Sequence, residues 1–247
     1  MERFLVRDDE TLDDLLLGNM KIIQPQKGYR FSIDSVLIAY FADLQGVQEV
    51  VDLGTGSGVI PLLLSYRNPY IKITGVELIE TVAQRANRNI LYNGLSSRIR
   101  ILEADIKNLH HLLPPGGVDL VISNPPFWKK GEGRISKNQE QAVARHELIV
   151  DLPQIIKTAG YLLHSAGKLC IIHRADRLEE ILKYLNENQL NRIRMRMVQP
   201  FQDKPANLVL VEAQKSTLEE ISESIPLVIY KQRGVYSEEI QTIYARN

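Results

Sequence analysis

The chain has 247 residues, of which 44% are hydrophobic and 24% are charged, so it can bury a full core as one domain with an N-terminal extension. Its formal net charge is zero, which excludes a globally basic nucleic-acid-binding protein and leaves only a local basic patch for such a role. The single cysteine, Cys170, excludes an intrachain disulfide and a multi-cysteine zinc cluster, and its apolar neighbours predict a buried core residue.

The first 45 residues do not follow the strand–helix alternation of the rest of the chain, and we predict that they form an N-terminal extension packed on the core. Within them, residues 28–39 are typical of a hairpin or loop that leads into a short helix, capped by Ser32 or Asp34. The N-terminus lacks the apolar segment of a signal peptide, and no apolar stretch is long enough to cross a membrane. We therefore expect a soluble, cytoplasmic protein that does not bind a membrane.

Residues 46–247 are predicted to form the main domain, because short apolar runs alternate there with helical patterns. Strands are predicted at Glu49–Leu53, Ile71–Glu77, Ile99–Leu102, Val118–Ser123 and Lys168–His173. Helices are predicted around Val59–Tyr66, Val82–Asn93, Leu152–Leu163 and Leu178–Asn188. Strands that are apolar throughout and separated by helices indicate a parallel sheet covered on both faces. The sequence therefore predicts a doubly wound α/β core.

The end of the chain follows a different pattern. Residues Arg192–Val198 alternate between polar and apolar side chains, and the apolar run Asn207–Glu212 follows with no room for a crossover helix, so the two strands must be antiparallel. A mostly parallel seven-stranded sheet that ends in an antiparallel hairpin resembles the Rossmann-like class I methyltransferases, whereas nicotinamide-binding folds continue in parallel. Residues Ile225–Tyr230 are a candidate edge strand, and the last residues are expected to form a short tail.

A glycine-rich loop follows the first predicted strand of the core. Its glycines, Gly54, Gly56 and Gly58, allow a sharp turn and the close approach of a ligand to the backbone, with Thr55 between them. The G-x-G-x-G spacing differs from the G-x-G-x-x-G spacing of dinucleotide-binding folds. The loop therefore favours S-adenosylmethionine over NAD.

Three acidic residues lie near the carboxyl ends of the predicted strands, which is the edge where open α/β sheets bind ligands. Glu77 follows the glycines at the distance expected for an acid that binds ribose hydroxyls. Asp52 is a candidate for the methionine end of the cofactor, although a structural role at the strand end is nearly as well supported. Asp105 and Ile106 are candidates for the adenine amine and a ring face, and capping of the next helix is the competing role for Asp105.

The catalytic candidate is Asn124-Pro125-Pro126-Phe127, which follows the fourth predicted strand. The amine of a nucleobase or amide is a poor nucleophile, because its lone pair is delocalised. The Asn124 side-chain oxygen and the Pro125 carbonyl can accept both N–H bonds of such an amine and direct its lone pair at the methyl donor. The prolines stiffen the loop and remove competing donors, and Phe127 offers a stacking face. Orientation would then supply most of the rate. The competing interpretation is a rigid turn at the strand exit.

Together these residues resemble the amino-group methyltransferases that carry an Asn-Pro-Pro-aromatic motif, and most closely the bacterial tRNA (valine) adenine-N6 methyltransferases. The resemblance extends from about Gly28 to Glu212 and also includes the segments Phe31–Leu37 and Ala144–Glu147. It implies that Asp34 and its neighbours contact the cofactor and that residues 144–147 lie near the target. Asn124 is a candidate cofactor contact as well as a catalytic residue. Many relatives have tyrosine where this chain has Phe127, so any role of that hydroxyl is lost.

The resemblance implies an RNA substrate, and three sets of residues are candidates to bind it. These are Trp128, Lys129, Lys130 and Arg134 after the catalytic motif, then Arg145 and His146, and then Arg192, Arg194 and Arg196 on one face of a strand. A solvated loop and a soluble sheet face remain alternatives. We predict no metal site, because the histidines are scattered and the amine needs no strong base. The sequence does not determine the oligomeric state, and a monomer is the default.

Other functions remain open at this point. The same chemistry could act on an adenine or guanine of ribosomal RNA, or on a release-factor glutamine, although 45 residues are too few for the helical N-terminal domain of enzymes that methylate release factors. An inactive cofactor-binding module is disfavoured by the intact catalytic motif. A nicotinamide oxidoreductase is disfavoured by the glycine spacing and the antiparallel ending.

Overall fold

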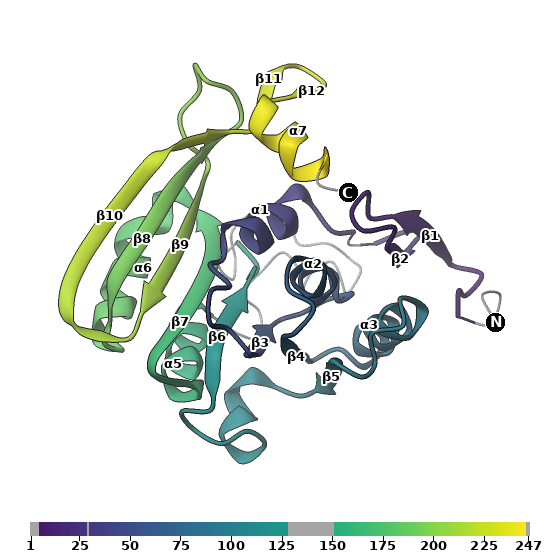
Figure 1. The fold of residues 1–247 in the computed structure, drawn as a ribbon, viewed down its shortest axis with the longest axis horizontal. Helices are drawn as coiled ribbons and strands as arrows, with labels where there is room; N and C mark the ends of the chain where they lie inside the picture. Colours follow the sequence, from purple (N-terminus) through teal and green to yellow (C-terminus); the bar gives the residue numbers. More distant parts are fainter. Residues whose placement is uncertain (1–4, 29, 128–150, 246–247) are drawn as a thin grey trace.

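A computed structural model describes residues 5–28, 30–127 and 151–245, and every structural statement below concerns these residues. A central sheet of eight strands runs through the molecule (Figure 1). In spatial order it contains β10 (Ser216–Val228), β8 (Leu190–Gln199), β9 (Leu208–Gln214), β7 (Leu163–Arg174), β6 (Val118–Ser123), β3 (Glu49–Leu53), β4 (Lys72–Glu77) and β5 (Ile99–Glu103). The five predicted parallel strands and the two strands of the antiparallel ending are all present.

The pairing confirms the Rossmann-like methyltransferase fold. Neighbouring strands from β7 to β5 are parallel, whereas β9 is antiparallel to both β7 and β8. The expected seven strands become eight, because β10 adds to the edge of the sheet in parallel with β8. The edge strand predicted at Ile225–Tyr230 therefore begins much earlier, at Ser216. Most of β10 is exposed and rich in Ser and Glu, so its sequence lacks the apolar pattern of a strand.

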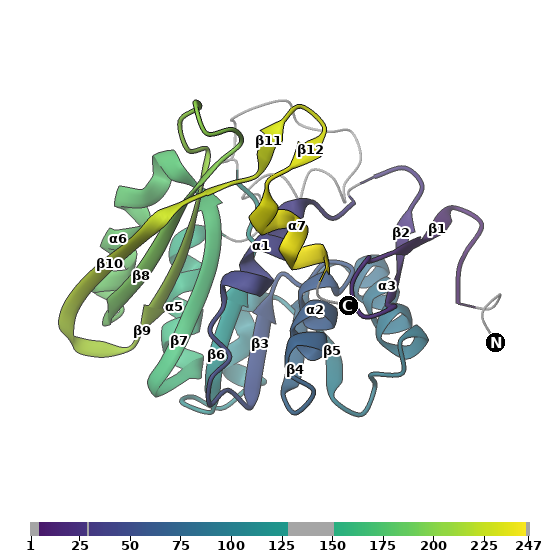
Figure 2. The same ribbon diagram turned by 45° about the horizontal axis from the view of Figure 1, so that its top comes forward.

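Helices cover both faces of the sheet, as Figure 2 shows with α1 and α2 in front and α5 and α6 behind. One face carries α1 (Ile33–Phe41), α2 (Val59–Arg67), α3 (Glu80–Tyr92) and α7 (Glu238–Ala245). The other carries α5 (Leu152–Leu162), α6 (Leu178–Glu187) and the 3-10 helix η2 (Ile106–His111), and a second 3-10 helix, η3 (Ala175–Arg177), precedes α6. Each face has its own apolar core, and Cys170 is fully buried in the first, as predicted.

The prediction of a C-terminal tail was wrong. After the short hairpin of β11 (Tyr230–Gln232) and β12 (Val235–Tyr236), the chain forms helix α7. Ile240 and Ile243 are buried in the same core as α1 and α2, and their spacing of three residues places them on one helical face. Two buried positions in so short a segment were too weak a pattern to predict a helix.

The N-terminal hairpin consists of β1 (Glu10–Asp14) and β2 (Lys21–Pro25), and it lies beside α3 in both views (Figures 1 and 2). The hairpin or loop predicted from residue 28 was therefore placed too late, although the short helix that follows it is present as α1. Ser32 occupies the N-cap position of α1 without a side-chain capping bond, because its hydroxyl donates to Asp34 instead, at 2.8 Å.

Within the part of the chain that the structure describes, none of the helices has the length and apolarity needed to cross a membrane.

Candidate active site

The candidate site lies where the carboxyl ends of β3, β4, β5 and β6 meet. The strand register places Asp52 beside Gly75 on one side and Ile122 on the other, so these strands end at a common edge. Ser123 strengthens this edge, because its buried hydroxyl donates a hydrogen bond of 2.8 Å to the Leu53 carbonyl. The loops that follow β3 and β6 are therefore held next to each other.

The glycine loop after β3 has the backbone conformation that its sequence predicts. Gly54, Gly56 and Gly58 all have positive φ angles, of 76°, 57° and 83°. A Cβ atom at Gly54 or Gly56 would meet nothing within 4 Å, whereas one at Gly58 would contact Ala86 of α3. The first two glycines thus leave room in front of the loop, and the third permits close packing against α3.

Glu77 at the end of β4 holds the glycine loop. Its carboxylate accepts hydrogen bonds from the backbone amides of Gly56, at 3.0 Å, and Ile79, at 2.9 Å. The residue is only 9% exposed, so this carboxylate is largely buried at the end of β4. Each carboxylate oxygen has two lone pairs, and the side chain can still accept hydrogen bonds from the hydroxyls of a ligand.

Asp52 and Thr55 carry buried polar atoms with no hydrogen-bond partner among the described residues. Asp52 is fully buried; burial raises the pKa of its carboxyl to about 7, and the nearby charge of Glu77 adds to the rise. Buried polar groups are normally satisfied, and orphaned ones at a sheet edge indicate a place for a polar ligand or ordered water. These residues and the open glycine loop fit a nucleoside cofactor with an amino-acid tail.

Asp105 performs the capping role that was considered for it. Its side chain accepts a hydrogen bond of 2.9 Å from the Lys107 amide at the start of η2. Ile106 is 8% exposed and belongs to the second core. The Ala104 amide bonds to the Glu77 carbonyl, so this turn lies next to the carboxyl end of β4, and both residues remain candidates for the adenine ring.

The catalytic candidate Asn124 lies directly after β6 and is half-buried. Its Nδ2 atom donates to the hydroxyl of Ser35 on α1, at 3.3 Å. That bond occupies one end of the amide and, among the described residues, leaves the Oδ1 atom available as an acceptor. Asp34, next to Ser35, is also partly buried; burial raises the pKa of its carboxyl, and the bond from Ser32 partly offsets the rise.

Phe127 packs against a residue that sequence reasoning did not include, His173 at the end of β7. The two ring centroids lie 5.4 Å apart. His173 is fully buried, and burial together with the nearby Arg177 charge lowers the pKa of its imidazole to about 3, so the ring is neutral at pH 7. Its place at the carboxyl end of the predicted strand Lys168–His173 could have indicated that His173 lies near the site. Ser35 had only the signal that it follows Asp34.

Of the candidate RNA-binding residues, the structure describes only the three arginines of β8. Trp128, Lys129, Lys130, Arg134, Arg145 and His146 lie outside the described residues. The three arginines of β8 do lie on the opposite face from Ile193, but each has an acidic partner within the chain. Arg192 pairs with Glu220, Arg194 with Glu212, and Arg196 with Glu239. Among the described residues, no cluster of three His, Cys, Asp or Glu side chains is arranged to hold a metal ion.

The fold is shared with solved methyltransferase structures. The chain superposes with a TM-score of 0.68 on a predicted O-methyltransferase from Agrobacterium tumefaciens, at 22% identity, covering 85% of this chain and 95% of that one. It also matches an S-adenosylmethionine-dependent O-methyltransferase from Thermotoga maritima, with a TM-score of 0.55 and 20% identity, covering 78% of this chain and 69% of the other. At these identities the likeness concerns the fold alone.

Sequence comparison gives the family. Residues 33–192 match the model of the methyltransferase small domain. A tRNA1(Val) (adenine(37)-N6)-methyltransferase from Porphyromonas gingivalis is 31% identical over 218 residues, covering 85% of each chain. A protein of the same name from Aliivibrio salmonicida is 24% identical and covers 87% of this chain and 88% of its own length. The chain therefore belongs to the methyltransferase small-domain family and, within it, groups with the tRNA1(Val) (adenine(37)-N6)-methyltransferases.

Proposed function

We propose that this protein transfers a methyl group from S-adenosylmethionine to the N6 amine of an adenosine in the anticodon loop of a tRNA. The observation that carries the proposal is the position of Asn124. It lies at the carboxyl end of β6, beside the strand that leads into the glycine loop, with its Nδ2 atom bonded to Ser35 and its Oδ1 atom available. The relatives named above, whose names specify adenine 37 of tRNA1(Val), support the choice of substrate.

The chain's own residues orient the acceptor. Asn124 Oδ1 and the Pro125 carbonyl accept the two N–H bonds of the adenine amine, which directs the nitrogen lone pair toward the methyl group. Pro125 and Pro126 lack an N–H group, so neither adds a donor that would repel the amine protons. S-adenosylmethionine, when bound, supplies a methyl group on a positively charged sulfur. After the transfer, the extra proton of the amine leaves to solvent.

Phe127 provides the stacking surface for the adenine ring. Its own ring is supported by the neutral imidazole of His173, at 5.4 Å between centroids, and by the first apolar core. A neutral, buried support suits this role, because a charged imidazole here would require solvation that the site lacks. A target adenine in a folded loop must still be turned out of its stack to reach this surface.

The cofactor-binding roles are assigned to residues at the same sheet edge. Glu77 would accept from the ribose hydroxyls while it keeps its bonds to Gly56 and Ile79. The orphaned Asp52 carboxylate would be satisfied by the amino end of the methionine moiety, directly or through water. Asp105 and Ile106 would contact the adenine of the cofactor.

The test is transfer of tritiated methyl groups from S-adenosylmethionine to unmodified tRNA, followed by nucleoside analysis. We expect label in N6-methyladenosine on a valine tRNA, and none on the same tRNA with guanosine at position 37. Asn124→Ala should abolish transfer and leave cofactor binding nearly intact. Label on ribosomal RNA or on a release factor instead of tRNA would overturn the assignment of tRNA as the substrate. Full activity of Asn124→Ala would overturn the catalytic role of Asn124.

A further inference from the structure

Helix α3 pairs with the N-terminal hairpin through two asparagine side chains. Asn89 Oδ1 accepts from the Ile23 amide at 2.6 Å, and its Nδ2 atom donates to the Ile23 carbonyl at 3.1 Å. Asn93 repeats the arrangement one turn later with Lys21, at 3.0 and 2.8 Å. Four residues of helix rise about 6 Å and two residues of strand about 6.7 Å, so the two amides match alternate residues of β2.

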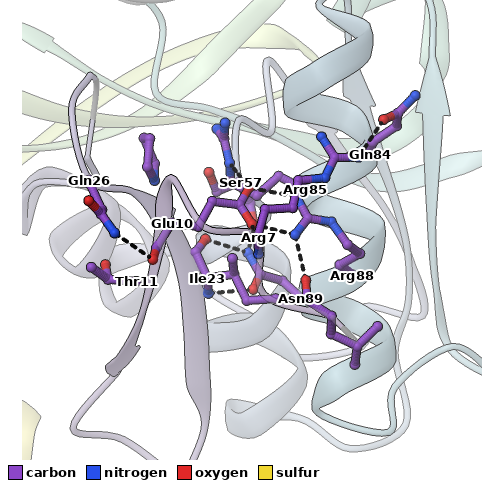
Figure 3. A network of polar contacts seen from close by, with 12 residues as sticks. Arg7, Glu10, Thr11, Ile23, Gln26, Ser57, Gln84, Arg85, Arg88 and Asn89 are labelled. Carbon is purple, nitrogen blue, oxygen red and sulfur yellow. Dashed lines mark hydrogen bonds and ion pairs between the residues drawn. The ribbon is translucent and has the colours of Figure 1, made fainter. Parts of the chain in front are cut away.

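Asn89 makes one further bond that Asn93 lacks. Its Nδ2 atom also donates to the carbonyl of Ser57, at 2.9 Å, inside the glycine loop. The second bond of Asn93 Nδ2 returns to the carbonyl of Asn89 within the same helix, at 2.8 Å. Asn89 is fully buried, and Figure 3 shows it between Ile23 of the hairpin and Ser57 of the loop. It is therefore the point where hairpin, helix and loop meet.

The glycine loop needs such a contact, because Gly56 and Gly58 on either side of Ser57 restrict the backbone little. The Gly56 amide is held by Glu77, at 3.0 Å. The Ser57 carbonyl is held by Asn89 on the other side of the loop. Two hydrogen bonds from different elements thus fix two peptide groups of the loop, the one before Gly56 and the one after Ser57.

We propose that Asn89 is a positioning residue that fixes the conformation of the cofactor loop through its bond to the Ser57 carbonyl. The inference rests on the proposed function in one respect, that the loop binds S-adenosylmethionine. Asn89 lies behind the loop and acts only through the Ser57 carbonyl. It should therefore control the affinity for the cofactor and not the chemical step.

A separate set of contacts docks the hairpin without touching the loop. Glu10 of β1 is buried and accepts hydrogen bonds from Arg85, at 3.0 Å, and from Arg88 of α3, at 2.6 Å to the Arg88 Nη2 atom (Figure 3). Together with Asn93, Glu10 secures the hairpin to the helix. Variants at these positions therefore separate loss of docking from loss of the loop contact.

The experiment compares Asn89→Ala with its matched control Asn93→Ala. Isothermal titration with S-adenosylmethionine measures the Kd, thermal unfolding measures stability, and circular dichroism verifies the fold. Both variants lose two bonds to β2, so we expect a lower Tm in each. Only Asn89→Ala should raise the Kd, by about fivefold to thirtyfold for one lost buried contact. The kcat for tRNA at saturating cofactor should stay within about twofold.

A second variant covers the case that Asn89→Ala fails to fold. Asn89→Asp keeps the acceptor for the Ile23 amide but places a carboxylate against the Ile23 and Ser57 carbonyls, and it should raise the Kd at least as much. An unchanged Kd in the folded Asn89 variants, or equal increases in the Asn89 and Asn93 variants, would overturn the proposal. Absence of cofactor binding by the unmodified protein would instead overturn the proposed function.

Discussion

Asn124 and Ser35 are 89 residues apart in the sequence, yet the Asn124 side chain donates a hydrogen bond to the Ser35 hydroxyl. Helix α1 therefore contributes directly to the orientation of the catalytic candidate. The contact also gives a physical role to the segment Phe31–Leu37, which sequence resemblance alone only placed near the cofactor.

We predict that Ser35→Ala lowers kcat by about fivefold to thirtyfold, the value of one orienting hydrogen bond of 1–2 kcal/mol. The Asn124 amide would then sample other rotamers and present Oδ1 less often. The KM for S-adenosylmethionine should not change. Ser35→Thr, which keeps the hydroxyl, should restore part of the rate, and a normal kcat in Ser35→Ala would show that the contact does not orient Asn124.

Glu77→Gln should weaken cofactor binding, because it replaces a charged acceptor with an amide that cannot receive both backbone N–H bonds and the ribose hydroxyls. We expect the Kd to rise by about tenfold or more, measured by titration calorimetry. Glu103 is the matched control, since it lies opposite Glu77 in the strand register and is exposed. Glu103→Gln should leave the Kd unchanged, and equal effects of both variants would contradict the ribose assignment.

The buried His173 should make the protein less stable as the pH falls. Its pKa is lowered from 6.5 to about 3, chiefly by burial, so below pH 6.5 the unfolded chain binds a proton that the folded protein does not. The free energy of unfolding should therefore decrease from about pH 6.5 downward. Denaturation with urea at pH 7.5, 6.0 and 5.0 measures this slope, and His173→Gln should flatten it. An unchanged slope in the variant would place the titration elsewhere.

Glu10 should add a second acid transition at lower pH. Burial alone would raise the pKa of its carboxylate, but bonds from Arg88, the Arg7 amide and Arg85 outweigh that effect and lower it to about 2. The ionised Glu10 carboxylate therefore stabilises the folded protein fully above pH 4.5, which is its pKa in the unfolded chain. This stabilisation is lost as the pH falls toward 2.

The same contacts predict the cost of removing Glu10. Glu10→Gln should cost about 3–5 kcal/mol of unfolding free energy, because it leaves two arginines without their buried acid. Asp14→Asn on the same hairpin, whose partner Lys21 is 40% exposed in its side chain, should have little effect in the same urea titration. Similar losses from both variants would show that the hairpin does not depend on the buried pair.

The arginines of β8 should separate into structural and RNA-binding residues. Arg196 forms two bonds to Glu239, of 2.5 and 2.8 Å, and its side chain is 17% exposed, so Arg196→Ala should lower the Tm and leave the KM for tRNA unchanged. Arg192 and its partner Glu220 are both about 60% exposed, and such a surface pair can exchange for phosphate at little cost. Arg192→Ala should raise the KM for tRNA with no loss of stability. The opposite pattern would exclude Arg192 as a phosphate contact.

Much of the fold could be predicted from the sequence, because the inner strands are uniformly apolar and their spacing by helices leaves few topologies. The glycine loop and Asn124 were predictable for the same local reason, since both follow directly after such a strand. The longer β10 and helix α7 were missed, because most of β10 is exposed and the pattern that buries α7 is short. Their place in the molecule comes from contacts with β8 and the first core, which no local pattern reports.

Side-chain partners that are distant in sequence were the other part that could not be predicted. Asn89 lies within a predicted helix, where an asparagine side chain is normally exposed to solvent. Its partners Ser57 and Ile23 are 32 and 66 residues away in the sequence. His173 and Ser35 likewise gain their roles only when β7 and α1 come together at the sheet edge. Such residues have chemistry that is visible in the sequence, but their environment exists only in the folded molecule.

The asparagine pairing of α3 also determines which backbone groups β2 could offer to a strand of another molecule. A two-stranded hairpin leaves a row of unpaired backbone amides and carbonyls along its outer side, and such a row can recruit a strand from another molecule. Asn89 and Asn93 occupy these groups at Ile23 and Lys21 with side-chain amides of the same chain. At these two residues of β2, the helix thus occupies the backbone groups that an incoming third strand would need.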